Sequence, residues 1–149
     1  MLVLIQRVSS ASVTINEEVK GQIESGFVIL LGIEHEDHQE DVAWLVKKIV
    51  ALRVFGDDNG KMNLSIRDID GSCLLISQFT LHASTRKGNR PSFIKAARPD
   101  HAIPLYQSFI RALRNEGITV REGEFGADMK VSLVNDGPVT IIIDTKIKE

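Results

Sequence analysis

The chain's 149 residues suffice for one domain with a buried core, and 43% of them are apolar and 26% charged, as in ordinary globular proteins. No apolar run approaches the length of a membrane span, and the formal net charge of −2 argues against a protein that binds nucleic acid over its whole surface. The only cysteine, Cys73, excludes an internal disulfide, so we expect a buried, inert thiol and a cytoplasmic location.

The first part of the chain predicts a series of strands. Leu2–Val8 alternates weakly, Ser9-Ser10 breaks the pattern, and residues 11–15 alternate again, which predicts two strands. Residues 19–24 are expected to follow as an edge strand. Residues 27–33 are apolar throughout, which predicts a strand buried on both faces.

Two amphipathic helices are predicted further along. Asp37 followed by Glu40 fits a capping box, and apolar residues at helical spacing extend this helix to about Arg53. Asp100 is a suitable cap for a second helix, which Gly117 would close. The other expected strands are 72–79, 118–121 and the arms of a final hairpin, 129–134 and 139–144.

This order of elements predicts a single α+β domain spanning residues 1–149. We expect a mostly antiparallel sheet, curled toward a barrel, with the two helices packed against it. No repeat, linker or low-complexity stretch divides the chain.

A turn-forming stretch, Asn135-Asp-Gly-Pro-Val-Thr140, separates the arms of the predicted hairpin. A plain tight turn has this composition. Pro138, however, has no N–H and permits a cis bond at modest cost. Gly137 has no Cβ, so another molecule can approach its backbone closely. The stretch is therefore either an ordinary turn or a rigid tip that presents backbone carbonyls.

Charge is distributed unevenly. Residues 71–99 contain no Asp or Glu and carry +5, so the other 120 residues carry −7. Such a local basic patch suits an anionic ligand, although a solvated loop has the same composition. The five bases are Arg86, Lys87, Arg90, Lys95 and Arg98.

Candidate catalytic groups follow the buried strand. Thr80 as a nucleophile would need an activating base, whereas the backbone N–H groups of residues 79 and 80 could stabilise an oxyanion. Local bonds between hydroxyls and backbone would explain the same residues without catalysis. His82 and His101 flank the basic patch as possible general bases, but their spacing assigns them no role. His35-x-x-His38 lacks the H-E-x-x-H arrangement, so no metal site is predicted.

Four stretches carry a resemblance to a known family, namely Ile5–Val13, Ser77-Gln-Phe-Thr-Leu81, Arg86-Lys-Gly-Asn-Arg-Pro-Ser-Phe93 and Asn135-Asp-Gly-Pro-Val-Thr140. Together they resemble the D-aminoacyl-tRNA deacylase (D-tyrosyl-tRNA deacylase) family, over the whole chain. The resemblance implies a homodimer without a cofactor. The resemblance also implies that the protein hydrolyses the ester between a D-amino acid, or mischarged glycine, and the 3′ end of tRNA.

The resemblance also implies roles for single residues. Gly137-Pro138 would be a Gly-cisPro filter inserted from the other subunit, and Arg7 would help to hold it. The tRNA would lie on the basic patch, with no membrane involved. The pocket floor would comprise substrate-binding Ser77 and the catalytic residues Gln78, Phe79 and Thr80.

Two mechanisms and two rival functions stay open. Either Thr80 is the nucleophile, or the 2′-hydroxyl of the RNA assists; the second is favoured because no base is spaced to activate Thr80. A small-molecule esterase using Thr80 or Ser77 is one rival. A non-enzymatic RNA- or DNA-binding module is the other. It would lack an aromatic stacking platform, because aromatic residues are 5% of the chain and few fall near the bases.

Overall fold

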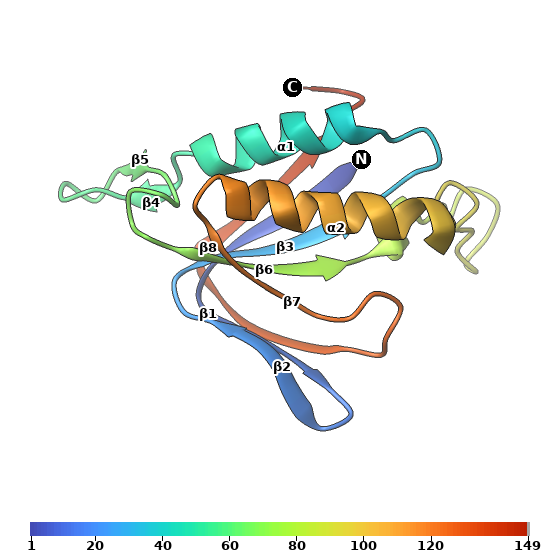
Figure 1. Ribbon diagram of the computed structural model, residues 1–149, viewed down its shortest axis with the longest axis horizontal. Helices are drawn as coiled ribbons and strands as arrows, with labels where there is room; N and C mark the ends of the chain where they lie inside the picture. The colour runs from blue at the N-terminus through green and yellow to red at the C-terminus, as the bar shows by residue number, and fades with distance from the viewer. Residues whose placement is uncertain (149) are drawn as a thin grey trace.

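The computed structural model describes residues 1–148, which form a curved sheet covered on one face by two helices (Figure 1). The helices are α1 (Gln39–Ala51) and α2 (Pro99–Asn115), and a short 3₁₀-helix, η1, spans Phe79–His82. The strands are β1 (Leu2–Ile15), β2 (Glu18–Ile23), β3 (Gly26–Gly32), β4 (Phe55–Gly56), β5 (Met62–Leu64), β6 (Ser72–Ser77), β7 (Thr119–Glu122) and β8 (Lys130–Asp144).

Strand β1 is the centre of the sheet, because three strands pair with it antiparallel. Its first half pairs with β3 and its second half with β2, while β8 follows its other edge along nearly the full length. The predicted break at Ser9-Ser10 is wrong. A shift in the register with β8 near Val8 and Ser10 absorbs the irregularity, so the chain stays extended there.

The remainder of the sheet is parallel. After the crossover through α1, β6 pairs parallel with β3, and after the crossover through α2, β7 pairs parallel with β6. The predicted mostly antiparallel sheet is therefore a mixed one. Its expected curl is present: a Cβ on Gly21 of β2 would lie 3.1 Å from the carbonyl oxygen of Glu122 in β7, so the two edges nearly meet.

The central strands bury both faces, as their continuous apolar sequence predicts. Alternate residues of β3 and β6 point in opposite directions, so one set meets the helices and the other lines the inside of the curl. The helix-facing residues are Phe27, Ile29, Leu31, Cys73 and Leu75, and those inside the curl are Val28, Leu74 and Ile76.

Both helices form as predicted, but their first residues differ from the expected caps. The N–H of His38 donates to Asp41 Oδ2 at 2.8 Å, so the capping residues are His38 and Asp41 rather than Asp37 and Glu40. The side chain of Asp37 is buried, and its Oδ1 accepts a hydrogen bond from the Met1 ammonium nitrogen at 2.6 Å. Helix α2 begins at Pro99, with Asp100 in its first turn.

The predicted final hairpin is wrong, because β8 is one continuous strand whose two arms both pair with β1. Gln6 pairs with Thr140 and Val8 with Asn135, so Arg7 alone lies opposite residues 136–139. The Asn-Asp-Gly-Pro stretch is thus a bulge and not a chain reversal. Turn-forming residues do not distinguish a bulge from a hairpin turn, since both need residues that leave the strand hydrogen-bonding pattern.

Neither helix within residues 1–148 is long and apolar enough to cross a membrane.

The start of β3 contains a position that only glycine fits. Gly26 has φ +154°, and a Cβ there would lie 1.8 Å from the carbonyl oxygen of Ser72 on β6. We expect Gly26→Ala to lower the free energy of unfolding by at least about 2 kcal/mol, because the two strands must separate to admit the methyl group. Urea unfolding followed by circular dichroism measures this.

The matched control is Gly56→Ala in β4, where a Cβ would meet nothing within 4 Å. Its free energy of unfolding should differ from that of the parent by less than about 0.5 kcal/mol. Equal midpoints for the two variants would contradict the close approach of β3 and β6.

Candidate active site

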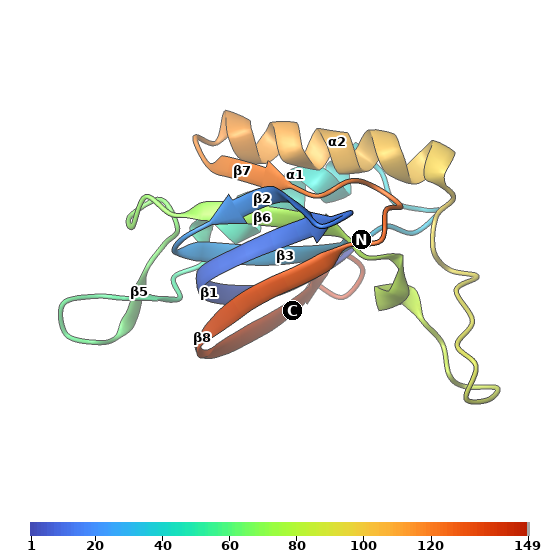
Figure 2. The same ribbon diagram turned by 90° about the horizontal axis from the view of Figure 1, so that it is seen from below.

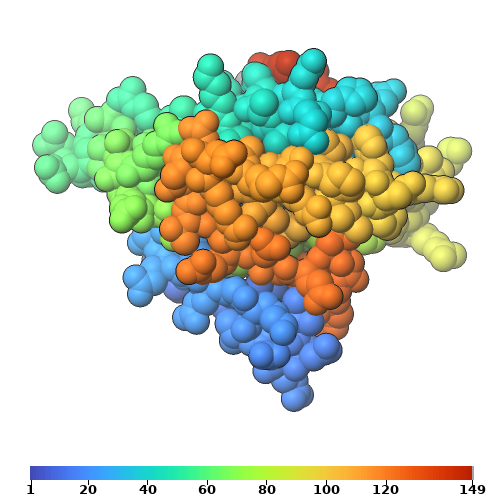
Figure 3. Space-filling view, in the orientation of Figure 1, coloured from blue at the N-terminus to red at the C-terminus, as the bar shows by residue number. Residues whose placement is uncertain are grey.

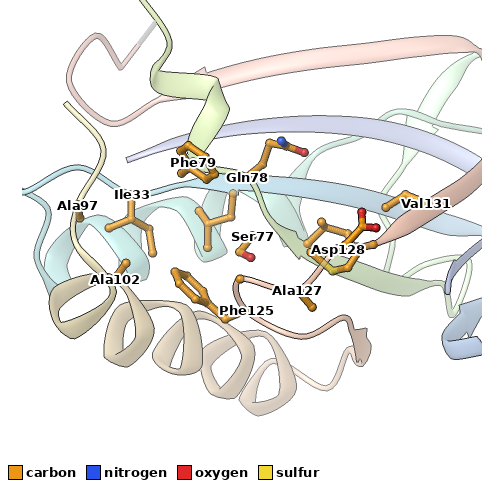
Figure 4. A pocket seen from close by; sticks show the side chains of 14 residues that line it. Ile33, Ser77, Gln78, Phe79, Ala97, Ala102, Phe125, Ala127, Asp128 and Val131 are labelled. Carbon is orange, nitrogen blue, oxygen red and sulfur yellow. The ribbon is translucent and has the colours of Figure 1, made fainter. Parts of the chain in front are cut away.

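A cleft of about 300 Å³ opens where the three parallel strands β3, β6 and β7 end (Figure 4). Clefts of this kind form at the carboxyl ends of parallel strands because the chain turns away from the sheet there. The residues that line it are Leu31, Ile33, Ile76, Ser77, Gln78, Phe79, Ala97, Ala102, Phe125, Gly126, Ala127, Asp128, Met129 and Val131.

Three of the four predicted pocket residues line this cleft, namely Ser77, Gln78 and Phe79. Strand β6 ends at Ser77, two residues before the predicted end, and the chain turns into η1 at Phe79. The N–H of Gln78 donates to the carbonyl of Leu31 on β3 at 2.8 Å, which fixes the start of this turn. Thr80 lies exposed beside the cleft, and its hydroxyl accepts a hydrogen bond from the Gln78 side-chain amide.

The wall opposite η1 was missed at the sequence level. It comes from the loop after β7, which contributes Phe125 and Asp128 (Figure 4) and also Met129 to the cleft lining. Residues 122–128 contain two glycines among mostly polar residues, and this composition predicts only a loop. Strand direction could have predicted this wall. If β7 runs parallel to β6, the loop after β7 must lie at the same edge of the sheet as the residues after β6.

The histidines near the cleft are held by other groups. His82 is buried, with Nδ1 3.2 Å from Glu34 Oε1, and His101 Nε2 lies 3.0 Å from the carbonyl oxygen of Asp37. Burial raises the pKa of Glu34, but the hydrogen bond from Lys146 and the nearby positive charges outweigh it, so this pKa is below its usual value. Neither histidine lines the cleft.

Cys73 is also excluded from catalysis. Its side chain is fully buried within β6, and burial raises the pKa of its thiol to about 12. A thiol with this pKa is almost entirely protonated near neutral pH, so it is a weak nucleophile. The predicted burial of Cys73 is confirmed.

The bulge in β8 is held by Arg7. Its Nε donates to the carbonyl of Asp136 at 2.9 Å, and its Nη1 donates to the carbonyl of Val54 at 2.6 Å. Gly137 has φ +137°, and a Cβ there would lie 2.8 Å from Val139 Cγ2 and 3.0 Å from Arg7 Nη2. The Gly137–Pro138 bond is cis, and both residues are exposed.

This tip lies far from the cleft of its own chain. Arg7, opposite the tip, pairs with Phe27 of β3, whereas the cleft begins at the level of Leu31 and Ser77. Four residues of a strand span about 13 Å. Strands β1 and β3 also lie between β8 and β6. Figure 2 shows the bend of β8 at one end of the sheet and η1 at the other.

Residues 84–98, the part of the basic patch that holds all five of its basic residues, are called the basic segment. This segment projects from the cleft end of the molecule, where it is coloured yellow-green in Figure 3. Its five bases are exposed, and within residues 1–148 none of them forms an ion pair with a carboxylate. Two aromatic rings meet beside this segment, a contact that the sequence did not predict. The rings of Phe79 and Phe93 meet with their centroids 5.0 Å apart, because η1 turns Phe79 toward this segment.

Within residues 1–148, no group of three or more His, Cys, Asp or Glu side chains is arranged to hold a metal ion. The polar side chains that line the cleft are those of Ser77, Gln78 and Asp128, and the other side chains along its walls are apolar.

Comparison with known protein families gives a match to the D-Tyr-tRNA(Tyr) deacylase family over residues 4–144. Curated relatives called D-aminoacyl-tRNA deacylase align over 100% of both chains. The protein from Flavobacterium johnsoniae is 56% identical, and the one from Bacteroides fragilis is 62% identical.

Two solved structures are similar. One, described as a c-Myc DNA unwinding element binding protein, has a TM-score of 0.91 and 41% identity, over 97% of this chain and 99% of that one. The other, described as a probable eukaryotic D-amino acid tRNA deacylase, has a TM-score of 0.80 over 95% of this chain and 97% of that one. Its identity of 16% makes it a likeness of fold alone.

Proposed function

This chain belongs to the D-Tyr-tRNA(Tyr) deacylase family, and from that membership we propose that it hydrolyses the ester bond of D-aminoacyl-tRNA. Water is added across the ester, which releases the D-amino acid and leaves the terminal ribose hydroxyl of the tRNA. The family match over residues 4–144 carries this proposal. The cleft at Ser77–Phe79 supports it, since apolar walls with a few polar groups suit a small amino-acid ester.

The selectivity for D-amino acids would come from Gly137-Pro138 of a second copy of the chain. The tip is exposed and distant from its own cleft, so it can serve a cleft only if another copy supplies it. This geometry supports a homodimer in which each subunit completes the site of the other. A symmetric pair with two such contacts is the commonest arrangement of soluble oligomers.

A tip made of backbone can select chirality by exclusion. Its carbonyls would accept hydrogen bonds from the substrate's α-amino group, and its backbone would fill the space on one side of the α-carbon. An L side chain would have to enter that space, which raises the free energy of the wrong complex. A D side chain points elsewhere and glycine has none, so many D-amino acids and mischarged glycine are accepted.

The chemistry is best assigned to the RNA. The Thr80 hydroxyl accepts a hydrogen bond from the Gln78 amide, and neither His82 nor His101, which are both engaged away from the cleft, is in place to activate it. The 2′-hydroxyl of the terminal ribose would then assist the attack. Phe79 and Thr80 begin η1, and the first N–H groups of a helix have no partner within it, which suits them to stabilise an oxyanion.

The basic segment would hold the tRNA through phosphates near its acceptor end. Its exposed bases lie on the chain that returns to the cleft at Ala97, so phosphates and ester can be bound together. Local binding of this kind does not require a positive protein, and the net charge of −2 is compatible with it. We also propose the cytoplasm, where charged tRNA is used, as the site of action.

A second candidate function is DNA binding without catalysis. It is favoured by the description of the structural relative that is 41% identical, a DNA unwinding element binding protein. The same basic segment would serve as the contact. The two functions differ in what happens to an aminoacyl ester, because a protein that only binds protects it.

The direct test is incubation of the protein with D- and L-aminoacyl-tRNA that carry the same amino acid. We expect rapid release of the D-amino acid, because its side chain avoids the excluded space, and an L-ester that decays no faster than in buffer. Thin-layer chromatography of the labelled amino acid measures both. Slower decay of the D-ester than in buffer would identify a binding protein and contradict the deacylase.

Thr80→Ala tests the choice of nucleophile. We expect single-turnover hydrolysis within about tenfold of the parent. Loss of a true nucleophile costs on the order of 10⁶ in kcat. The control variant Thr80→Ser keeps the hydroxyl, and a substrate with a 2′-deoxy terminal ribose removes the proposed assisting group. A loss of several orders of magnitude in Thr80→Ala, with the 2′-deoxy ester still hydrolysed, would assign the attack to Thr80.

Arg7→Met tests the support of the tip. The variant loses the bonds to Asp136 and Val54, and a hydrogen bond from a charged donor contributes about 1.5–3 kcal/mol. We expect the ratio of D- to L-ester hydrolysis rates to fall by at least about tenfold.

The matched control for Arg7→Met is Arg67→Met. Arg67 is an exposed arginine that likewise donates to a backbone carbonyl, that of Glu116 at 3.3 Å, and it lies outside both the tip and the cleft. Its D-to-L ratio should equal that of the parent. An unchanged ratio in Arg7→Met would remove the tip from chiral selection.

A further inference from the structure

An exposed pair of aromatic rings stands at the mouth of the cleft. Phe79 and Phe93 pack edge to face, with centroids 5.0 Å apart and an interplanar angle of 74°. Phe79 keeps 55% of its surface exposed and Phe93 keeps 36%. Each ring covers only part of the other, so the pair leaves apolar surface open to a ligand.

Backbone hydrogen bonds fix where Phe93 lies. Ser84 and Ser92 exchange two of them, at 2.8 and 2.9 Å, which close residues 85–91 into a loop whose base adjoins Phe93. A few residues later, the N–H of Ala97 donates to the carbonyl of Ile33 at 2.9 Å and brings the chain back to the cleft wall. Phe93 is therefore held between the cleft and the closed loop.

The charges beyond Phe93 are all positive. The closed loop carries Arg86, Lys87 and Arg90, and Lys95 follows Phe93 after one intervening residue. All four are exposed, and within the described residues 1–148 none is neutralised by a carboxylate. A polyanion that runs from this loop to the cleft must pass the Phe93 ring.

We propose that Phe93 is a stacking platform for an unpaired base just before the terminal nucleotide of the RNA. This inference rests on the proposed function, which places the aminoacylated ribose in the cleft. The bases of the loop would bind the preceding phosphates while one nucleobase lies on the exposed ring. Proteins commonly bind single-stranded nucleic acid with aromatic rings beside basic side chains, because every nucleobase has a flat face that can stack on a ring.

Charge complementarity favours RNA over a protein partner at this ring. In a contact between two copies of the chain, the partner surface would have to neutralise the positive side chains of the loop, which form no ion pairs of their own. Single-stranded RNA supplies phosphates and flat bases together, at the spacing of one per nucleotide. One ligand, single-stranded RNA, thus explains why an exposed ring has unpaired basic side chains before and after it in the sequence.

The test uses two uncharged RNA hairpins, one blunt and one with a single-stranded 3′ extension. Because neither carries an ester, the result does not depend on catalysis. Fluorescence anisotropy should show tighter binding of the extended hairpin by the parent protein. Phe93→Ala should weaken binding of that hairpin by about tenfold, the factor expected for loss of one stacked base, and abolish the preference for the extension.

Three further variants separate stacking from bulk and from folding. Phe93→Leu keeps an apolar side chain but no flat face, so it should bind like Phe93→Ala, whereas Phe93→Tyr should bind like the parent. The matched control is Ile94→Ala, the neighbouring apolar residue, which is 85% exposed and carries no ring. It should keep the preference for the extension.

Several results would overturn the inference. They are equal binding of the two hairpins by the parent, full binding by Phe93→Leu, or a change in sedimentation of the Phe93 variants that assigns the ring to a contact between copies. Failure of the proposed function is distinct from all of these. It would show as an intact D-aminoacyl ester with the parent protein, whatever the hairpins reveal.

Discussion

The antiparallel pairing of β1 with β8 is the constraint on which the rest of this structure depends. It runs from Leu2 and Asp144 at one end to Thr14 and Lys130 at the other, and it joins the two ends of the described chain. With β8 on one edge, β1 offers only its other edge to β2 and β3. The sheet must then grow through β3 to β6 and β7, and their crossovers place both helices on the same face.

The same pairing accounts for the tip. β8 pairs with β1 on both sides of residues 136–139, but its register shifts between Gln6 and Val8. These four residues therefore have no strand partner and must leave the sheet opposite Arg7. A guanidinium at that position can bind the carbonyl that the departing strand no longer shares with β1. The position of Arg7 and the shape of the tip are therefore two consequences of one register. That register also sends the tip to the end of the sheet away from the cleft.

The cleft has a separate origin in the parallel half of the sheet. Strands β3, β6 and β7 share a direction, so the segments that follow them gather at one edge and supply opposite walls. The turn into η1 brings Phe79 to this edge, where its ring meets Phe93 of the basic segment. A mixed sheet thus carries two different features, a tip and a cleft, at opposite ends, which is why two copies suit the proposed site better than one.

Local pattern was a sufficient guide for part of the architecture. Helical spacing of apolar residues predicted α1 and α2 to within a few residues, and uninterrupted apolar sequence predicted that β3 and β6 bury both faces. It failed where a partner strand decides the outcome. Ser9-Ser10 looks like a strand break and the Asn-Asp-Gly-Pro stretch like a chain reversal. Both lie within strands, because pairing between β1 and β8 holds the chain extended on either side.

The sequence by itself determined the two helices, the buried strands, the inert Cys73, the acid-free basic segment and the motifs of the family. These depend on residue type and short spacing, which a single chain displays directly. Only the tertiary structure decided that Phe125, Asp128 and Met129 share a cleft with Ser77, that Phe93 meets Phe79, and that the tip is a bulge held by Arg7. Each of these results joins segments distant in sequence, and strand direction and register alone bring them together.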